Sequence, residues 1–269
     1  LQQVFFADGT ASGYQYFDVA TNEMKDWATD VTTGSLPVGN NDATIACRLL
    51  AIYRSRVVLS GLRESPENWF MSRAGDPFDW DFSQEDALAA VAGNASDAGQ
   101  LGDLVTALAP FQDDLMFIGG ANSLWVMSGD PAAGGRLDKV ADNVGIVSAS
   151  AWVFSPGGQF FFLGRNGFYK VTSASSPPEN ISSQRLDQFL ADIDYSKTRA
   201  TLVYDSKWQG VHVFFEKTEE PATPPVHLFW DERNDAFWKD EYPAPIGPSA
   251  VTPLASDGNR TVSTLLGGF

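Results

Sequence analysis

Short apolar runs of strand length alternate with turns rich in glycine, proline, asparagine and aspartate along most of the chain, a pattern typical of β-strands. One strand-and-turn unit occurs twice with a similar amino-acid sequence. Trp69-Phe70-Met71-Ser72 is followed by Asp76-Pro77, and Trp125-Val126-Met127-Ser128 is followed by Gly129-Asp130-Pro131. Each copy follows an apolar run and a glycine-containing turn, as the second strand of a hairpin does. A repeated hairpin predicts repeated architecture.

The same hairpin recurs more loosely over the whole chain. We expect first strands to begin at residues 4, 57, 115, 160, 211 and 262, so that successive starts lie 45 to 58 residues apart. This spacing is close to the ~40–50 residues of known propeller repeats. The hairpin expected to begin at 262–268 has a first strand but no second strand after it. The sequence therefore predicts an all-β fold, a β-propeller of about five or six antiparallel blades, as a single domain over residues 1–269, complete or part of a longer chain.

Helical periodicity is convincing in one stretch only. Its apolar residues fall at i, i+3, i+4 and i+7: Leu186, Phe189, Leu190 and Ile193. This spacing predicts one short inserted helix over residues 183–193, with Ser182 as its N-cap and Ile181 and Leu186 as a hydrophobic staple.

Four other segments are assigned from composition. Residues 84–92 are interpreted as a short alanine-rich helix and residues 104–108 as a blade strand, although such short runs do not distinguish the two types. Residues 221–225 predict a stiff loop inside a hairpin. Residues 243–253 predict an extended connection between blades, because their four prolines lack the amide that a strand ladder needs.

Composition narrows the classes of function. The chain is 43% hydrophobic, which is enough for a packed core, and its longest apolar runs are far shorter than the ~20 residues of a membrane helix, so we expect no membrane insertion. The single cysteine, Cys47, excludes an internal disulfide framework. With 34 acidic against 18 basic side chains the net charge is −16, which disfavours DNA wrapping or sequence reading because such a surface repels phosphates.

The two histidines, His212 and His227, are the first candidates for chemistry. Both fall in predicted strands of one hairpin, where they face each other or join Glu216 or Asp231 as metal ligands. The spacing indicates no third ligand, so we favour a partly buried pair of strand residues and predict no metal site. Cys47 lies in an apolar run without a histidine partner and is interpreted as a small buried residue.

The acidic segment Gly75-Asp76-Pro77-Phe78-Asp79-Trp80-Asp81 allows two interpretations. Asp79 and Asp81 on one face of an extended segment would form an acid pair or a calcium loop. Because Gly-Asp-Pro recurs at 129–131 in the equivalent place, we favour turn chemistry, in which glycine relaxes the backbone, aspartate accepts from nearby amides and proline fixes φ.

Tryptophans and glycines add no site of their own. Six tryptophans are candidates for sugar-stacking platforms: Trp69, Trp80, Trp125, Trp208, Trp230 and Trp238. Several fall at repeat-equivalent strand positions, so we interpret most of them as packing between blades. No glycine-rich phosphate loop and no G-x-S-x-G motif is present. We therefore predict no catalytic, cofactor-binding or metal site.

Three pairs of segments carry a family resemblance. They are residues 53–61 (YRSRVVLSG) with 71–80 (MSRAGDPFDW), 113–118 (DDLMFI) with 123–131 (SLWVMSGDP), and 144–148 (VGIVS) with 161–169 (FFLGRNGFY). Together with the helix predicted after them, these segments resemble the β-propeller virion proteins of tailed bacteriophages, the tail-nozzle and packaged-DNA-stabilisation (head-closure) proteins. The resemblance runs from residue 43 to 193 and, more weakly, to residue 238.

The resemblance implies a non-enzymatic structural component of the virion, in the tail nozzle or in the neck that connects head and tail. The partners it implies are copies of the chain in a ring, other tail or neck proteins, and DNA that passes transiently and without sequence preference. An acidic inner wall would repel the phosphates of that DNA. Two alternatives stay open: a carbohydrate-binding or glycoside-hydrolysing propeller, with converging acids and exposed tryptophans in a cleft, and a propeller scaffold for protein partners.

Overall fold

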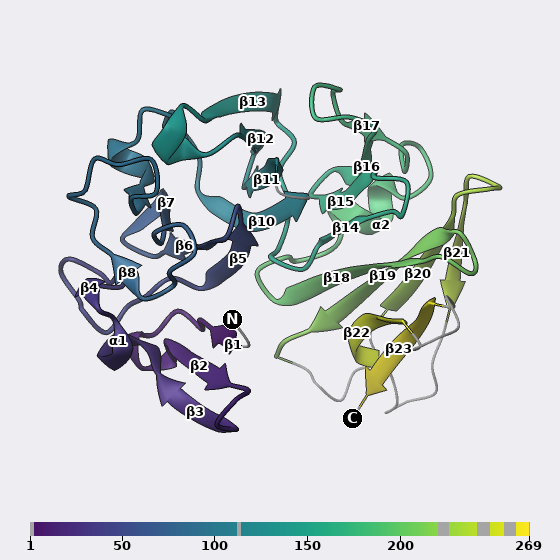
Figure 1. Ribbon diagram of the computed structural model, residues 1–269. Helices are drawn as coiled ribbons and strands as arrows, with labels where there is room; N and C mark the ends of the chain where they lie inside the picture. Colours follow the sequence, from purple (N-terminus) through teal and green to yellow (C-terminus); the bar gives the residue numbers. More distant parts are fainter. Residues whose placement is uncertain (1–2, 112–113, 220–225, 241–247, 256–261, 269) are drawn as a thin grey trace. The chain divides into compact units, whose positions relative to one another are not determined.

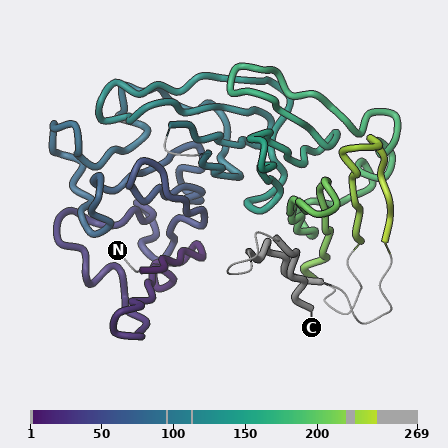
Figure 2. Tube along the Cα trace, turned by 45° about the vertical axis from the view of Figure 1, so that its right-hand side comes forward, coloured from purple at the N-terminus to yellow at the C-terminus, as the bar shows by residue number. Residues whose placement is uncertain are grey.

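The computed structural model describes residues 3–111, 114–219, 226–240, 248–255 and 262–268. Over these residues the chain is mostly β-strand, in six antiparallel sheets (Figure 1). It divides into two compact units, Leu1–Asp142 (unit 1) and Asn143–Phe269 (unit 2). Figure 2 traces the Cα path of the chain, coloured from purple at the N-terminus toward yellow. None of the described helices is long and apolar enough to cross a bilayer.

Unit 1 contains one three-stranded and two four-stranded antiparallel sheets. The three-stranded sheet is β1 (Gln3–Phe6), β2 (Gln15–Asp18) and β3 (Glu23–Asp26). The four-stranded sheets are β5 (Leu49–Tyr53), β6 (Arg56–Leu62), β7 (Ser65–Met71) and β9 (Val91–Ala92), then β10 (Val105–Phe111), β11 (Leu115–Gly120), β12 (Ser123–Ser128) and β13 (Arg136–Asp142). Smaller elements are α1 (Trp27–Asp30), the parallel pair β4 (Thr33–Gly34) and β8 (Asp79–Trp80), and three 3-10 turns at Ala11–Gly13, Gly93–Ala95 and Pro131–Ala133.

Unit 2 contains two four-stranded sheets, one two-stranded sheet and one short helix. The four-stranded sheets are β14 (Trp152–Phe154), β15 (Phe160–Gly164), β16 (Gly167–Val171) and β17 (Glu179–Asn180), then β18 (Thr198–Asp205), β19 (Gly210–Lys217), β20 (Val226–Asp231) and β21 (Ala236–Asp240). The rest is α2 (Asp187–Ala191) and the pair β22 (Pro248–Ala255) and β23 (Val262–Gly268).

The predicted hairpins are confirmed, and in each four-stranded sheet they are the two inner strands. β6 pairs with β7, β11 with β12, β15 with β16, and β19 with β20. Inner strands are covered on both faces, so they read as continuous apolar runs; all residues of β6 and β15 are buried. Outer strands such as β13 and β21 expose much of their surface and therefore lack that signal.

The repeat-equivalent tryptophans occupy equivalent positions. Trp69 lies on β7 and Trp125 on β12, the third strand of each sheet, and both contribute to one core cluster with Met71 and Met127. In unit 2 the inter-sheet core is aromatic. Phe161 and Phe168 pack against Trp230, with ring centroids 5.2 and 6.0 Å apart.

The predicted helix is shorter than the periodicity indicates. α2 covers only Asp187–Ala191, and residue Leu186, not Ser182, is its N-cap. The Ser182 hydroxyl instead accepts from the Phe168 amide at 2.9 Å and donates to the Asn180 side chain, which ties this segment to the β16–β17 sheet. Gln184 has a φ of +66°, a left-handed conformation that a helix does not continue through.

Two further expectations are wrong. Residues 84–92 contain no helix but turns leading into β9, whereas residues 104–108 do enter a strand, β10. The predicted connection at 243–253 contains, from Pro248 on, strand β22, which is the partner that β23 was expected to lack. Prolines are tolerated there because β22 is an edge strand of a two-stranded sheet. The predicted loop at 221–225 lies outside the described residues.

Candidate functional site

One sheet of unit 2 aligns an ionisable side chain from each of its four strands. His212 Nδ1 lies 2.8 Å from His227 Nε2. At the ends of the row, His212 Nε2 lies 3.4 Å from Asp205 Oδ2, and His227 Nδ1 lies 3.2 Å from Asp240 Oδ2. The register places His212 opposite Phe229, so the histidines are diagonal neighbours on one face. We call this row the Asp–His–His–Asp chain.

Burial keeps the two imidazoles at the centre of the Asp–His–His–Asp chain uncharged. His227 is 2% exposed, and burial together with the neighbouring His212 lowers the pKa of its imidazole to about 4. Burial also lowers the pKa of His212, although its hydrogen bond to Asp205 acts in the opposite direction. Both rings are therefore neutral near pH 7, one donating and the other accepting across the 2.8 Å contact.

The candidate metal ligands do not join the histidines. Glu216 pairs with Arg199, and Asp231 accepts from the Arg233 amide at 2.9 Å and the Asn234 side chain at 2.7 Å in a turn. Within the described segments no three His, Cys, Asp or Glu side chains are arranged to hold a metal ion. The interpretation of the histidines as a partly buried strand pair is confirmed.

The pKa of His227 predicts a loss of stability in acid. Because the folded-state pKa lies near 4 and the unfolded value near 6.5, the unfolded chain binds a proton first as the pH falls between these values. The stability present above pH 6.5 is then lost by about 3 kcal/mol by pH 4. NMR titration of the two imidazoles checks the origin of this loss. A His227 midpoint at or above 6.5 in the folded protein contradicts the prediction.

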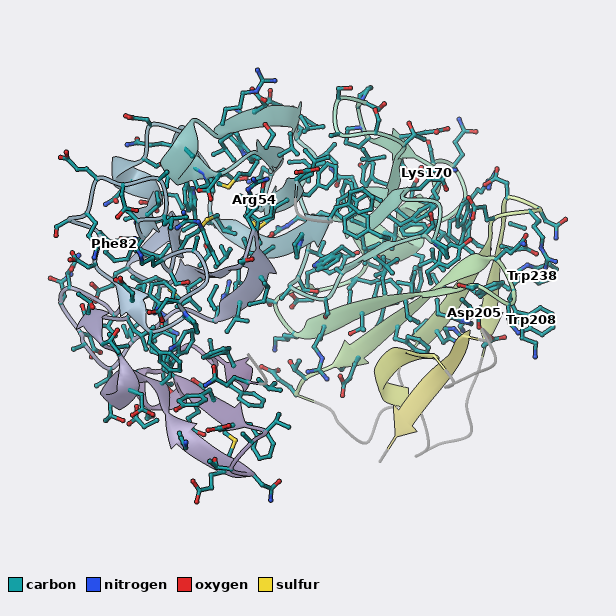
Figure 3. All side chains as sticks on the ribbon, in the orientation of Figure 1. Arg54, Phe82, Lys170, Asp205, Trp208 and Trp238 are labelled. Carbon is teal, nitrogen blue, oxygen red and sulfur yellow. The ribbon has the colours of Figure 1, made fainter. Side chains whose placement is uncertain are left out.

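Two of the six tryptophans do not pack between blades. Trp69, Trp80 and Trp230 are buried as predicted, and Trp125 is partly buried beneath the Lys139 ammonium. Trp208 and Trp238 are 55% and 58% exposed and project from the sheet that carries Asp205 (Figure 3).

These two tryptophans neighbour residues of the Asp–His–His–Asp chain along the backbone and the sheet register. The Trp208 amide donates to Asp205 at 3.0 Å. Trp238 lies opposite Phe229, whose ring centroid is 4.7 Å from that of His212. This face of β18–β21 therefore combines exposed aromatic surface with buried polar groups, a feature that the repeat pattern alone did not predict.

The Gly-Asp-Pro segments form the predicted turns. Gly75 and Gly129 have φ of +77° and +72°, which favours glycine. Asp76 accepts from the Phe78 amide at 2.9 Å, and Asp130 accepts from the Ala132 amide at 3.0 Å. Asp79 and Asp81 take part in the same kind of local turn chemistry, since each accepts from the backbone two residues on: Asp79 from the Asp81 amide and Asp81 from that of Ser83.

The two copies of the resembling motif dock onto each other, a contact that sequence reasoning missed. The Tyr53 hydroxyl donates to the carbonyls of Gly129, at 2.8 Å, and Asp114, at 3.1 Å. Arg54 and Arg56 form ion pairs with Asp114 and Asp130, at 3.2 and 3.1 Å. The Y-R-S-R segment of the first copy thus holds Asp114 and the G-D-P segment of the second. We call this contact the motif junction.

Arg56 is the centre of the motif junction. Its side chain is fully buried and donates to the carbonyls of Ser72, Leu88 and Ala87 at 2.9, 3.2 and 3.2 Å, besides Asp130. A buried guanidinium needs such complete pairing. The sequence signal that could have indicated this buried arginine is its position directly before a strand-length apolar run.

Cys47 is the small buried residue that the sequence predicts. It has no exposed surface, and its amide donates to the Tyr14 hydroxyl at 2.9 Å. Burial raises the pKa of the thiol to about 12, so the thiol stays protonated and unreactive at neutral pH.

Comparison with known proteins shows the fold. No family model and no curated protein matches the chain. The extracellular domain of the putative one-component system BT4673 from B. thetaiotaomicron is similar, with a TM-score of 0.55 and 12% identity over 97% of this chain and 30% of that one. The dihydro-heme d1 dehydrogenase NirN gives a TM-score of 0.52 and 16% identity over 98% of this chain and 48% of that one.

The chain thus spans less than half the length of either structure. Identities this low bear on architecture alone. Both similar structures have β-propeller-like folds, and the chain is an all-β protein of that class, with four-stranded antiparallel sheets as its blades and α2 as its short inserted helix. The organisation as one domain stays a prediction.

Proposed function

We propose that the chain is a non-enzymatic structural component of a tailed-phage virion, part of the tail or head-to-tail conduit through which DNA is retained and passed. The observation that carries this proposal is the motif junction. The segments that resemble virion propellers place Tyr53, Arg54 and Arg56 on the second copy of the motif, where they hold two sheets together. Their ionisable groups are structural, as expected of a protein that bears load rather than one that performs a reaction.

The charge of the chain supports a passage for DNA. Hydrogen bonds from nearby side chains lower the pKa of several partly or fully exposed carboxyl groups, among them Asp18, Asp42 and Asp81. These groups stay ionised at neutral pH, so the net charge of −16 persists. On a conduit wall such charge repels phosphates and lets the polymer slide.

Ring assembly and location in the particle test this proposal. We expect the purified chain, with its tail or neck partners present, to form closed rings in negative-stain images and mass photometry. Antibodies against it are expected to label the tail or neck of phage particles by immunogold microscopy. A chain that stays monomeric with those partners and is absent from particles contradicts the proposal.

A second candidate function, carbohydrate binding, is favoured by the exposure of Trp208 and Trp238. Exposed indoles with polar neighbours suit the apolar faces of sugar rings. Intrinsic fluorescence titrations with oligosaccharides of glucose, mannose and N-acetylglucosamine test it. We expect Trp208→Ala and Trp238→Ala each to weaken binding roughly 2- to 12-fold. Met24→Ala, which removes an equally exposed apolar side chain in unit 1, is the control. Equal binding by all variants, or none to any sugar, contradicts this function.

A further inference from the structure

Unit 1 contains a groove of about 660 Å³ whose charged lining includes two arginines, Arg48 and Arg63, and two aspartates, Asp8 and Asp42. Neither the motif junction nor the Asp–His–His–Asp chain includes these residues. We call it the Arg48–Arg63 groove.

A glycine makes room for one of the two guanidinium groups. The Arg48 amide donates to the Ser60 carbonyl at 3.1 Å, which places Arg48 beside the end of β6. Gly61, on β6, has a φ of +74°, and a Cβ atom there would lie 2.9 Å from Cγ and 3.3 Å from Nε of Arg48. The Arg48 side chain therefore lies across Gly61, two residues before Arg63 in the sequence. A side chain at residue 61 would displace it.

The carboxylates around the groove are occupied by other donors. Glu64, next to Arg63 in sequence, accepts from the amides of Asn41 and Asp42 at 2.9 and 3.1 Å. Asp8 accepts from the amide and the hydroxyl of Thr10, both at 2.8 Å. Asp42 accepts from the amide and the hydroxyl of Thr44, at 2.9 and 2.6 Å. Among the described residues neither Arg48 nor Arg63 has an ion pair.

The lack of an ion pair is unusual for a cationic side chain of this protein. Most described lysines and arginines form ion pairs with carboxylates, from Lys25 with Asp18 to Arg233 with Asp231. Arg165 and Lys207 also lack a carboxylate partner among the described residues, but neither lines the groove. The Lys207 ammonium lies over the Trp208 ring. In a chain of net charge −16, a groove with two guanidinium groups that form no ion pair among the described residues is a place where an anion is attracted.

We propose that the Arg48–Arg63 groove binds a phosphate group. A carboxylate offers two oxygens and suits one guanidinium fork, whereas a phosphate offers enough oxygens for two forks at once. If the chain lines a DNA conduit, as proposed above, the phosphate belongs to passing DNA; this assignment of the source rests on that proposed function. Asp8 and Asp42 stay ionised because their threonine hydrogen bonds lower their pKa values, so the attraction is weak, as transient contact requires.

Binding titrations with three probes test the proposal. The probes are inorganic phosphate, a labelled duplex of ~20 base pairs and poly-L-glutamate, each measured at low and moderate salt. We expect phosphate or duplex to bind the wild-type protein, and duplex affinity to fall roughly 3- to 12-fold between 50 and 200 mM salt, as for one or two phosphate contacts. The variant R48Q/R63Q is expected to lose this binding. R165Q, which removes a cation of unit 2, is expected to retain it.

Two controls separate the outcomes. R48K/R63K keeps both charges but loses the forks, so it is expected to bind more weakly than wild type and better than R48Q/R63Q. Because both arginines are exposed, thermal unfolding of every variant should match wild type. If phosphate binds but the duplex does not, the phosphate site is supported and only DNA is removed as the source of the phosphate. This conclusion does not depend on the result of the ring assay. Unchanged binding by R48Q/R63Q, no binding of phosphate or duplex, or arginine-dependent binding of poly-L-glutamate alone overturns the proposal.

Discussion

Replacing Arg56 by methionine is expected to lower the free energy of unfolding of unit 1 by about 3–5 kcal/mol. The variant keeps most of the side-chain volume but removes every donor. Asp130, only 14% exposed, loses its buried partner, and the carbonyls of Ser72, Ala87 and Leu88 lose theirs. Buried acceptors without donors carry their full desolvation cost. Urea-induced unfolding followed by circular dichroism measures the change.

Arg54 provides the matched control for this experiment. It lies two residues away in the same motif junction and pairs with Asp114, but its side chain is 34% exposed and that of Asp114 is 86% exposed. Arg54→Met is therefore expected to cost at most about 1 kcal/mol, the range of a surface ion pair. Equal effects of the two substitutions would mean that burial of Arg56 does not govern the stability of the junction.

Replacing Trp27 by alanine is expected to lower the free energy of unfolding of unit 1 by about 3–5 kcal/mol. Trp27 has no exposed surface and its ring lies 4.6 Å from Phe5 and 5.8 Å from both Tyr14 and Trp80, measured between centroids. Its indole also donates to the Pro77 carbonyl at 3.0 Å. The truncation leaves a cavity that these rigid aromatic neighbours fill poorly.

The control for this second prediction is Trp208→Ala, which makes the same chemical change at a side chain that is 55% exposed. Its expected effect is within about 0.5 kcal/mol, as for most surface substitutions. The same urea titration serves both variants. A small effect of Trp27→Ala would show that the cluster between β1–β3 and β8 contributes little to the stability of unit 1.

The inner strands could be predicted from sequence because both of their faces are buried. β15 reads as an uninterrupted apolar run for that reason, and so do residues 57–59 of β6. The Gly-Asp-Pro turns could be predicted because their chemistry is local, within two or three residues of Asp76 and Asp130. Strand β22 was missed because its prolines resemble those of a connection, and only pairing with β23 shows that they lie in an edge strand.

The remaining differences depend on contacts between distant residues. The alanine-rich segment at 84–92 has helix-forming residues, but the carbonyls that a helix would use, those of Ala87 and Leu88, accept from Arg56 instead. The Arg48–Arg63 groove and the exposure of Trp208 and Trp238 likewise depend on how strands pair and where loops fold back. Single-sequence periodicity does not contain that information.

Cys47 gives unit 1 an internal reporter of its own opening. It is the sole thiol of the chain and lies in the same core cluster as Trp27, fully shielded. An alkylating reagent therefore reacts only with molecules in which this core has opened, where the thiol regains its ordinary acidity. The modification rate, followed by mass spectrometry, then ranks the variants of unit 1 by how often the core opens under native conditions, without any added label.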